Sequence, residues 1–193
     1  MEKLKKERTV KVAMSLFSRH GIKNISLKDI AGETSSSLED LEKEFGNKSG
    51  LLLDCTLMEI NHIGKSLRNL INQSISPLEK FIQTCIIVFR YSRSNCPLFY
   101  KDLSYYPETE EIIAEFRGQI REICKNYLYQ GSKEGYFISG VNYENLVYIF
   151  IEELDNTPFK NQHFVMITFL QNILTGKGGV EILRILTPTH CEE

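Results

Sequence analysis

The chain has 193 residues, of which 42% are hydrophobic, and its formal net charge is −2. This length and composition suffice for one core of ordinary size, or for a small domain joined to a larger one. No run of roughly 18 or more apolar residues occurs, so the sequence predicts no membrane span and no membrane partner.

The five cysteines are Cys55, Cys85, Cys96, Cys124 and Cys191, and no two of them form a CxxC pair. Their odd number and wide spacing predict reduced thiols that pack as small apolar side chains. The basic N-terminus lacks the apolar stretch of a signal peptide, because polar residues interrupt it at positions 18–20. We therefore expect a cytoplasmic protein.

Charge is distributed unevenly along the chain. Residues 1–30 carry eight Lys or Arg and three acidic residues, whereas residues 31–54 carry two and six. Residues 55–193 hold 13 basic and 16 acidic side chains, so this part has no long-range attraction to a polyanion. The sign of the charge therefore changes within the N-terminal part.

The N-terminal part alternates helices and short turns. Apolar residues at positions 10, 13, 14 and 17 share one helix face, which predicts a helix over 5–20 that ends before Gly21. Ser26 and Ser37 are each followed three residues later by an aspartate, a capping pair that begins a short helix. Asn47 can then cap a long helix that extends to about residue 70.

The rest of the chain is also predicted to be helical. The apolar pattern predicts helices over residues 78–93, 98–106, 108–131, 143–154 and 163–174. The last two are apolar around much of their circumference, which is typical of helices buried in a core or against another chain. No strand-like alternation is present, so the predicted class is all-α. The GKGG segment at residues 176–179 lacks the rest of a phosphate-binding loop and is interpreted as a helix C-cap.

Several motifs together carry a family resemblance. AMSLFSRHG, KDIA and FGNKSGLL resemble the DNA-binding domain of the tetracycline-repressor (TetR) family, and CPLFYKDLSYYPE, YLYQGSKEGYF and FLQNILTGKGGVEIL resemble the effector domain of a subgroup of it. The resemblance implies a homodimeric transcriptional regulator, usually a repressor. It places a three-helix DNA-binding head with a helix-turn-helix in residues 1–47, and a larger helical effector-binding and dimerisation domain in residues 48–193. It also implies that an effector moves the two heads apart, which ruins their fit to half-sites about 34 Å apart.

The resemblance assigns candidate contacts to double-stranded operator DNA. Ser26 and Lys28 at the start of the second helix, and Lys48 at the start of the fourth, match positions that contact phosphate in the family. The turn and the third helix add four candidates, which are Ser36, Ser37, Leu38 and Lys43. Turn and cap chemistry is the simpler role for the serines, and core packing is expected for the leucine because of its spacing to Leu41 and Phe45.

The third helix departs from the family pattern because it is acidic. It carries Glu39, Asp40, Glu42 and Glu44 against the single base Lys43. DNA phosphates repel a carboxylate unless it accepts a hydrogen bond from a cytosine amino group. Two interpretations remain open: the head binds DNA weakly or through its basic first helix, or a helical homodimer has lost specific DNA binding and acts through ligand or protein contacts.

The larger domain contains candidates for two further sites. A small apolar or aromatic effector is expected in a pocket between helices, although core packing is the alternative for each aromatic residue that would line it. The candidate pocket residues are Phe81, Phe89, Phe99, Tyr100, Phe116 and Tyr127. A homodimer is expected through a four-helix bundle of the last two predicted helices and their symmetry mates. Its candidate contacts are Leu146, Ile149, Phe150, Phe164, Ile167 and Leu174.

Enzymatic activity has little support in the sequence. The four histidines are scattered along the chain without metal-ligand spacing, and no cysteine lies in a catalytic motif. The sequence therefore predicts no enzymatic activity, no metal and no cofactor.

Overall fold

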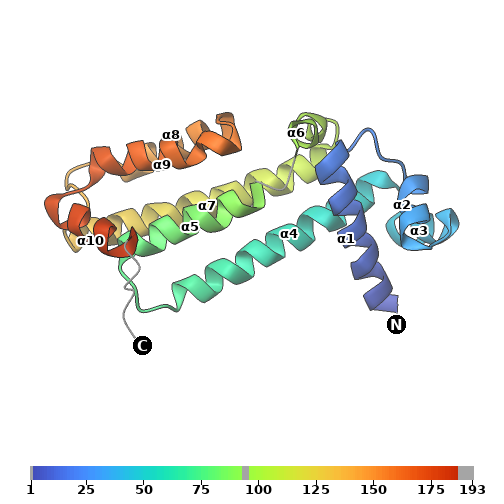
Figure 1. Ribbon diagram of the computed structural model, residues 1–193, viewed down its shortest axis with the longest axis horizontal. Helices are drawn as coiled ribbons and strands as arrows, with labels where there is room; N and C mark the ends of the chain where they lie inside the picture. Colours follow the sequence, from blue (N-terminus) through green and yellow to red (C-terminus); the bar gives the residue numbers. More distant parts are fainter. Residues whose placement is uncertain (1, 93–95, 187–193) are drawn as a thin grey trace. The chain divides into compact units, whose positions relative to one another are not determined.

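The computed structural model describes residues 2–92 and 96–186 (Figure 1). Within these residues the chain forms ten helices and no strand, so the predicted all-α class is confirmed. The helices are α1 (Glu2–His20), α2 (Leu27–Thr34), α3 (Leu38–Phe45), α4 (Lys48–Ile71), α5 (Pro77–Ser92), α6 (Pro97–Leu103), α7 (Pro107–Lys133), α8 (Tyr143–Asn156), α9 (Phe159–Ile173) and α10 (Gly176–Leu186).

The helices are distributed over two compact units. The first unit consists of Met1–Lys65 and Arg90–Arg117, and the second of Ser66–Phe89 and Gly118–Glu193. The predicted boundary at residues 47 and 48 does not coincide with this division, because α6 and parts of α4 and α7 belong to the first unit. Among the described helices, none combines the length and the apolarity needed to cross a membrane.

Local capping chemistry sets the starts of the short N-terminal helices. The Ser26 hydroxyl accepts the N–H of Asp29 at 3.2 Å, and the Asp29 carboxylate accepts the N–H of Ser26 at 2.8 Å. At the start of α3 the Ser37 hydroxyl accepts the N–H of Asp40 at 3.0 Å. These bonds satisfy backbone donors that have no partner inside a first helical turn.

The core of the first unit combines α1, α2, α3, α4 and α6. Its members share full or nearly full burial, and they include Phe17, Ile22, Ile30, Leu41, Phe45, Leu51, Leu52, Phe99 and Leu103. Burying one such side chain contributes about 1.5–3 kcal/mol. Two of them, Phe99 and Leu103, come from α6, so this helix is part of the core that supports the helix-turn-helix.

An aromatic cluster forms the centre of the second unit. Phe81 of α5 stacks on Phe169 of α9 with a centroid distance of 5.7 Å, and Phe150 of α8 stacks on Phe169 at 4.3 Å. Phe137, in the connection before α8, meets Phe81 edge to face at 6.4 Å. This cluster joins α5, α8 and α9 into one core.

The thiols in the described part of the chain are free. Cys55, Cys85 and Cys124 are buried and Cys96 is half-buried. Cys191 lies outside the described residues. The cysteines that are described therefore pack as small apolar side chains.

The sequence does not predict α10, and the interpretation of residues 176–179 as a helix C-cap is wrong. The preceding helix α9 ends at Ile173, and the Thr175 hydroxyl begins α10 by accepting the N–H of Gly178 at 3.1 Å. A Cβ at Gly178 would collide with the carbonyl oxygen of Tyr136. The glycine therefore permits close packing at the start of a helix.

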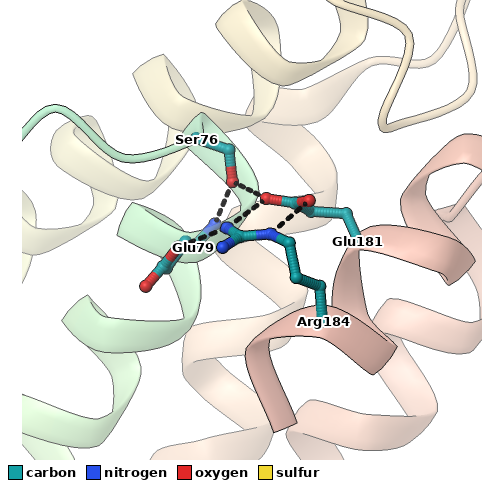
Figure 2. Close-up of polar contacts among 4 residues, drawn as sticks. All are labelled: Ser76, Glu79, Glu181 and Arg184. Carbon is teal, nitrogen blue, oxygen red and sulfur yellow. Dashed lines mark hydrogen bonds and ion pairs between the residues drawn. The ribbon is translucent and has the colours of Figure 1, made fainter. Parts of the chain in front are cut away.

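Four polar residues connect α10 to the start of α5 (Figure 2). The Ser76 hydroxyl accepts the N–H of Glu79 at 3.2 Å and donates to Glu181 at 2.8 Å. The Arg184 guanidinium donates to both carboxylate oxygens of Glu181, at 2.9 and 2.8 Å, and to the carboxylate of Glu79 at 3.0 Å. The hydrogen bond from Arg184 lowers the pKa of the Glu181 carboxyl below its ordinary value.

Replacing Arg184 by alanine should lower stability in a pH-dependent way. The pKa of Glu181 is lower in the folded than in the unfolded protein, so its contribution is present above about pH 4.5 and is lost as the pH falls through the folded pKa. The difference in unfolding free energy between wild type and R184A, measured by urea denaturation, should therefore be larger at pH 7 than at pH 3.

The matched control is Arg68→Ala on α4, since Arg68 is exposed and forms no ion pair within the part of the chain that is described. It should leave stability nearly unchanged at both pH values. A stability loss in R184A that is the same at pH 7 and pH 3 would contradict this account of the cluster.

Candidate nucleic-acid interface

The helices α2 and α3 are joined by a tight turn. Ser35 in this turn has a left-handed backbone with φ 54° and ψ 35°, and the N–H of Ser36 donates to the carbonyl of Ala31 at 3.2 Å. The two helices pack through Ile30 and Leu41, which are buried in the core of the first unit. This arrangement is a helix-turn-helix with α3 in the position of the recognition helix.

The outward surface of this motif contains most of the predicted DNA contacts. Exposed side chains come from α2, from the turn and from α3, and they are Ser26, Lys28, Ser37, Leu38 and Lys43. The expected core packing of Leu38 is not found, because 39% of this residue is exposed. Ser36 is half-buried, and its hydroxyl has no hydrogen-bond partner among the described residues.

Two of the acidic residues of α3 are paired with lysines of α1. Asp40 lies 3.6 Å from Lys5, and Glu44 lies 3.3 Å from Lys6, which also lies 2.9 Å from Asp54 of α4. The hydrogen bond with Asp54 raises the pKa of Lys6, and the Ser37 hydrogen bonds lower the pKa of Asp40. Residues 40 and 44 are four apart, so both lie on the face of α3 that is turned toward α1.

The remaining charges of α3 lie on its exposed side. Glu39, Glu42 and Lys43 are exposed, and they form no ion pair with any described residue. The exposed side of α3 therefore has two uncompensated carboxylates and one ammonium group. The sequence identified all four acids but gave no sign of which two would be neutralised, since their partners are 35 or more positions away in α1.

Basic residues of α1 line a hollow of about 490 Å³ on the first unit. It is bordered by Leu4, Lys5, Arg8, Thr9 and Thr34. The threonine hydroxyls donate to backbone carbonyls of their own helices. Arg8 is exposed, and it belongs to the basic first helix, for which contact with DNA was one of the interpretations left open by the sequence.

Lys48, at the start of α4, is half-buried and hydrogen-bonded to backbone carbonyls. Its ammonium group donates to the carbonyls of Ile22 and Ile25, both at 2.7 Å, and of Lys23 at 3.4 Å. Burial lowers the pKa of Lys48. The side chain is thus hydrogen-bonded to the connection between α1 and α2.

The structure distributes the predicted effector-pocket residues over both units. The first unit contains Phe99, which is part of its core, and Phe116; the second contains Phe81, Phe89 and Tyr127. Tyr100 belongs to α6, but its side chain lies outside those that the structure describes. The Tyr127 hydroxyl is buried and has no hydrogen-bond partner among the described residues, and burial raises its pKa.

The predicted dimer residues fall into three groups by exposure. Ile149 of α8 and Phe164 and Ile167 of α9 are 62, 60 and 44% exposed, and Leu146 and Leu174 are half-buried. Phe150 is only 2% exposed, because it belongs to the aromatic cluster. Tyr148, which was not predicted, adds a further exposed aromatic residue to α8. No group of three or more potential metal-binding side chains gathers in the described ranges.

Solved structures resemble this chain over almost its whole length. A TetR-family transcriptional regulator from Marinobacter aquaeolei has a TM-score of 0.76 at 17% identity, with 93% of this chain and 96% of that chain covered. The chain has the TetR-family fold. A transcriptional regulator from Saccharomonospora viridis in complex with choline also has a TM-score of 0.76, at 14% identity over 91% of this chain and 100% of that one.

A third structure with the same fold is the ketosteroid transcriptional regulator KstR2 of Mycobacterium tuberculosis. Its TM-score is 0.65 at 17% identity, and 88% of this chain and 95% of that chain are covered. By sequence alone, no family model and no curated protein matches. At these identities the comparisons establish the fold that the motifs predicted.

The two serines that precede α3 provide a test of its capping. Ser37→Ala should lower the unfolding free energy by about 1 kcal/mol, because the N–H of Asp40 loses its acceptor. Ser36→Ala should be neutral or stabilising, since it removes a buried hydroxyl that has no partner in the described structure. Urea denaturation of both variants gives the comparison, and equal destabilisation by both would refute the assignment of the cap.

Proposed function

We propose that the chain is a ligand-responsive transcriptional regulator of the TetR family, a repressor that binds operator DNA as a homodimer. The observation that carries this proposal is the TetR-family fold combined with an exposed helix-turn-helix surface on α2 and α3. The structural neighbours with this fold are transcriptional regulators. We propose no enzymatic activity.

Two lysines of the helix-turn-helix, one on α2 and one on α3, support contact with DNA phosphates. Lys28 and Lys43 are exposed and form no ion pair in the described part of the structure. Lysines of this kind can neutralise phosphates, which supplies most of the affinity of a protein for DNA. Asp40 and Glu44 of α3 already lie next to lysines of α1, although Lys6 is shared with Asp54, so the repulsion of DNA is smaller than the sequence suggests.

The exposed apolar side chains of α8 and α9 support a homodimer. Ile149, Phe164 and Ile167 would be buried if these helices packed against the same helices of a second copy. Exposed large apolar residues on neighbouring helices are typical of an interface, and an isologous contact buries each of them twice. Phe150 supports this surface from beneath, as part of the core.

One observation supports a small-molecule effector in the second unit. The buried Tyr127 hydroxyl has no partner in the described structure, so an effector that reached it would supply a hydrogen bond. The similar Saccharomonospora viridis structure was solved in complex with choline, and another neighbour is a ketosteroid regulator. Because these two chemistries differ, we propose a small effector with an apolar part and assign it to no narrower class.

One observation favours a second candidate function. Glu39 and Glu42 remain uncompensated on the exposed side of α3. The second candidate is a helical homodimer that has lost specific DNA binding and acts through ligand or protein contacts. In such a protein these carboxylates carry no penalty, because no DNA binds to α3.

The decisive experiment measures DNA binding of the wild type, with fragments from the promoter region of its own gene and with a random library. Lys28→Ala and Lys43→Ala should each weaken binding for all sequences and lower the salt slope by about 1 per subunit, because each removes a phosphate contact. Glu42→Gln should tighten binding, because it removes a carboxylate that DNA repels.

The matched control is Glu144→Gln, which removes an exposed carboxylate from α8 and should not change DNA affinity. If the wild type selects no DNA sequence from the library at low salt, and Glu42→Gln does not increase DNA affinity, the second candidate is established. A Glu42→Gln variant that binds one operator more weakly would show that Glu42 contacts a cytosine.

Assembly gives an independent prediction. Ile149→Glu should convert the dimer to a monomer at micromolar concentration, because a charge would be buried in an apolar interface. Ile71→Glu, at a similarly exposed isoleucine at the end of α4, should leave the dimer intact. Sedimentation velocity distinguishes these outcomes, and a wild type that sediments as a monomer would exclude the proposed interface.

A further inference from the structure

The connection between α1 and α2, residues 21–26, is held by side chains from two other helices. Lys48 of α4 binds its carbonyl groups, and Asp102 of α6 binds one of its N–H groups. Both residues belong to the first unit. This connection ends with Ser26 and leads directly to Lys28, the candidate phosphate contacts at the start of α2, so its position sets theirs.

The hydrogen bonds of Lys48 use all of its donors. An ammonium group has three N–H donors, and the carbonyls of Ile22, Lys23 and Ile25 all lie within hydrogen-bond distance of Nζ. Lys48 is also the first residue of α4, where the helix dipole disfavours a cation. The three carbonyls offset this cost, and they leave no N–H for a phosphate.

Asp102 holds the same connection from α6. Its buried carboxylate accepts the N–H of Lys23 at 2.7 Å, and its negative charge stabilises the ammonium form of Lys48. A buried carboxylate is costly unless it is hydrogen-bonded and close to a cation, and Asp102 satisfies both conditions within this one connection.

The approach of α6 to the end of α1 is unusually close. Gly21 has a φ of +84°, and a Cβ at this position would lie 2.9 Å from the Cβ of Leu98. The N–H of Cys96 donates to the carbonyl of Ser18 at 2.7 Å, and the ammonium of Lys23 lies 3.1 Å from the centre of the Tyr105 ring. These contacts fix α6 where Asp102 reaches Lys23.

We infer that Lys48 and Asp102 are positioning residues for DNA binding, which orient the start of α2 through the connection 21–26, and that Lys48 makes no phosphate contact itself. This inference rests on the proposed function. It assigns to α6, a helix outside the predicted head of residues 1–47, a direct part in the geometry of the DNA-binding surface. It also replaces the role that the family resemblance gave to Lys48.

The salt dependence of DNA binding separates a positioning lysine from a phosphate contact. Lys48→Ala should weaken binding without changing the slope of log affinity against log salt, whereas Lys28→Ala should lower that slope by about 1 per subunit. An equal fall of the slope in Lys48→Ala and Lys28→Ala would overturn the inference. Wild type that binds no DNA would overturn the proposed function, and with it any role of this pair in DNA binding.

Amide hydrogen exchange tests the connection itself without DNA. Asp102→Ala should accelerate exchange of the Lys23 N–H several-fold and weaken DNA binding, because the amide loses its acceptor. Asp102→Asn is the matched control: its side-chain carbonyl can still accept this hydrogen bond, so it should restore both the protection and most of the affinity. Unchanged Lys23 exchange and unchanged DNA affinity in Asp102→Ala would overturn the inference even if wild type binds its operator.

Discussion

The packing of α6 against the N-terminal helices is the interaction on which the first unit depends. α2 and α3 have eight residues each, and isolated helices shorter than about 12–15 residues are marginal in water. Their stability must therefore come from burial against neighbouring helices. Phe99 and Leu103 of α6 complete the core that contains Phe17 and Leu52, so an element from the middle of the chain supports the helix-turn-helix. The same packing brings Asp102 to Lys23, which couples the hydrogen bonds of the α1–α2 connection to the presence of α6.

The basic first helix and the acidic third helix are two parts of one electrostatic arrangement. Lys5 and Lys6 lie next to Asp40 and Glu44, and these side chains are all largely or partly exposed. Exposed pairs of this kind contribute only about 0–1 kcal/mol each, so their main consequence is the distribution of charge rather than stability. They neutralise one face of α3 and leave the charges of its outer face unchanged. The excess of positive charge in residues 1–30 therefore lies next to part of the excess of negative charge in residues 31–54.

Local chemistry explains which parts of the fold the sequence could predict. The starts of α2 and α3 follow from the cap serines, and the helix over 143–154 follows from its apolar pattern, because each signal lies within a few residues of the element. The contact of Asp102 with Lys23 spans 79 positions, so no local pattern contains it. α10 was missed for a similar reason, since its first turn depends on the close approach of Gly178 to Tyr136. Aromatic spacing likewise could not separate core from pocket: Phe81 stacks on Phe169 inside the second unit, whereas Phe99 supports the first.

The uncompensated glutamates have a specific consequence if the proposed function holds. Attraction between lysines and phosphates is nearly independent of sequence, so carboxylates at positions 39 and 42 weaken binding to every DNA site by a similar amount. Only a site that presents cytosine amino groups to these carboxylates offsets that penalty. Specificity is a difference between two affinities, and a group that penalises the wrong partner increases it as effectively as a new attraction to the right one. Lys48, whose ammonium group is hydrogen-bonded to backbone carbonyls, adds no free N–H donor to this surface. The carboxylates therefore weaken DNA binding in general, and they increase discrimination only where an operator presents cytosine amino groups to them.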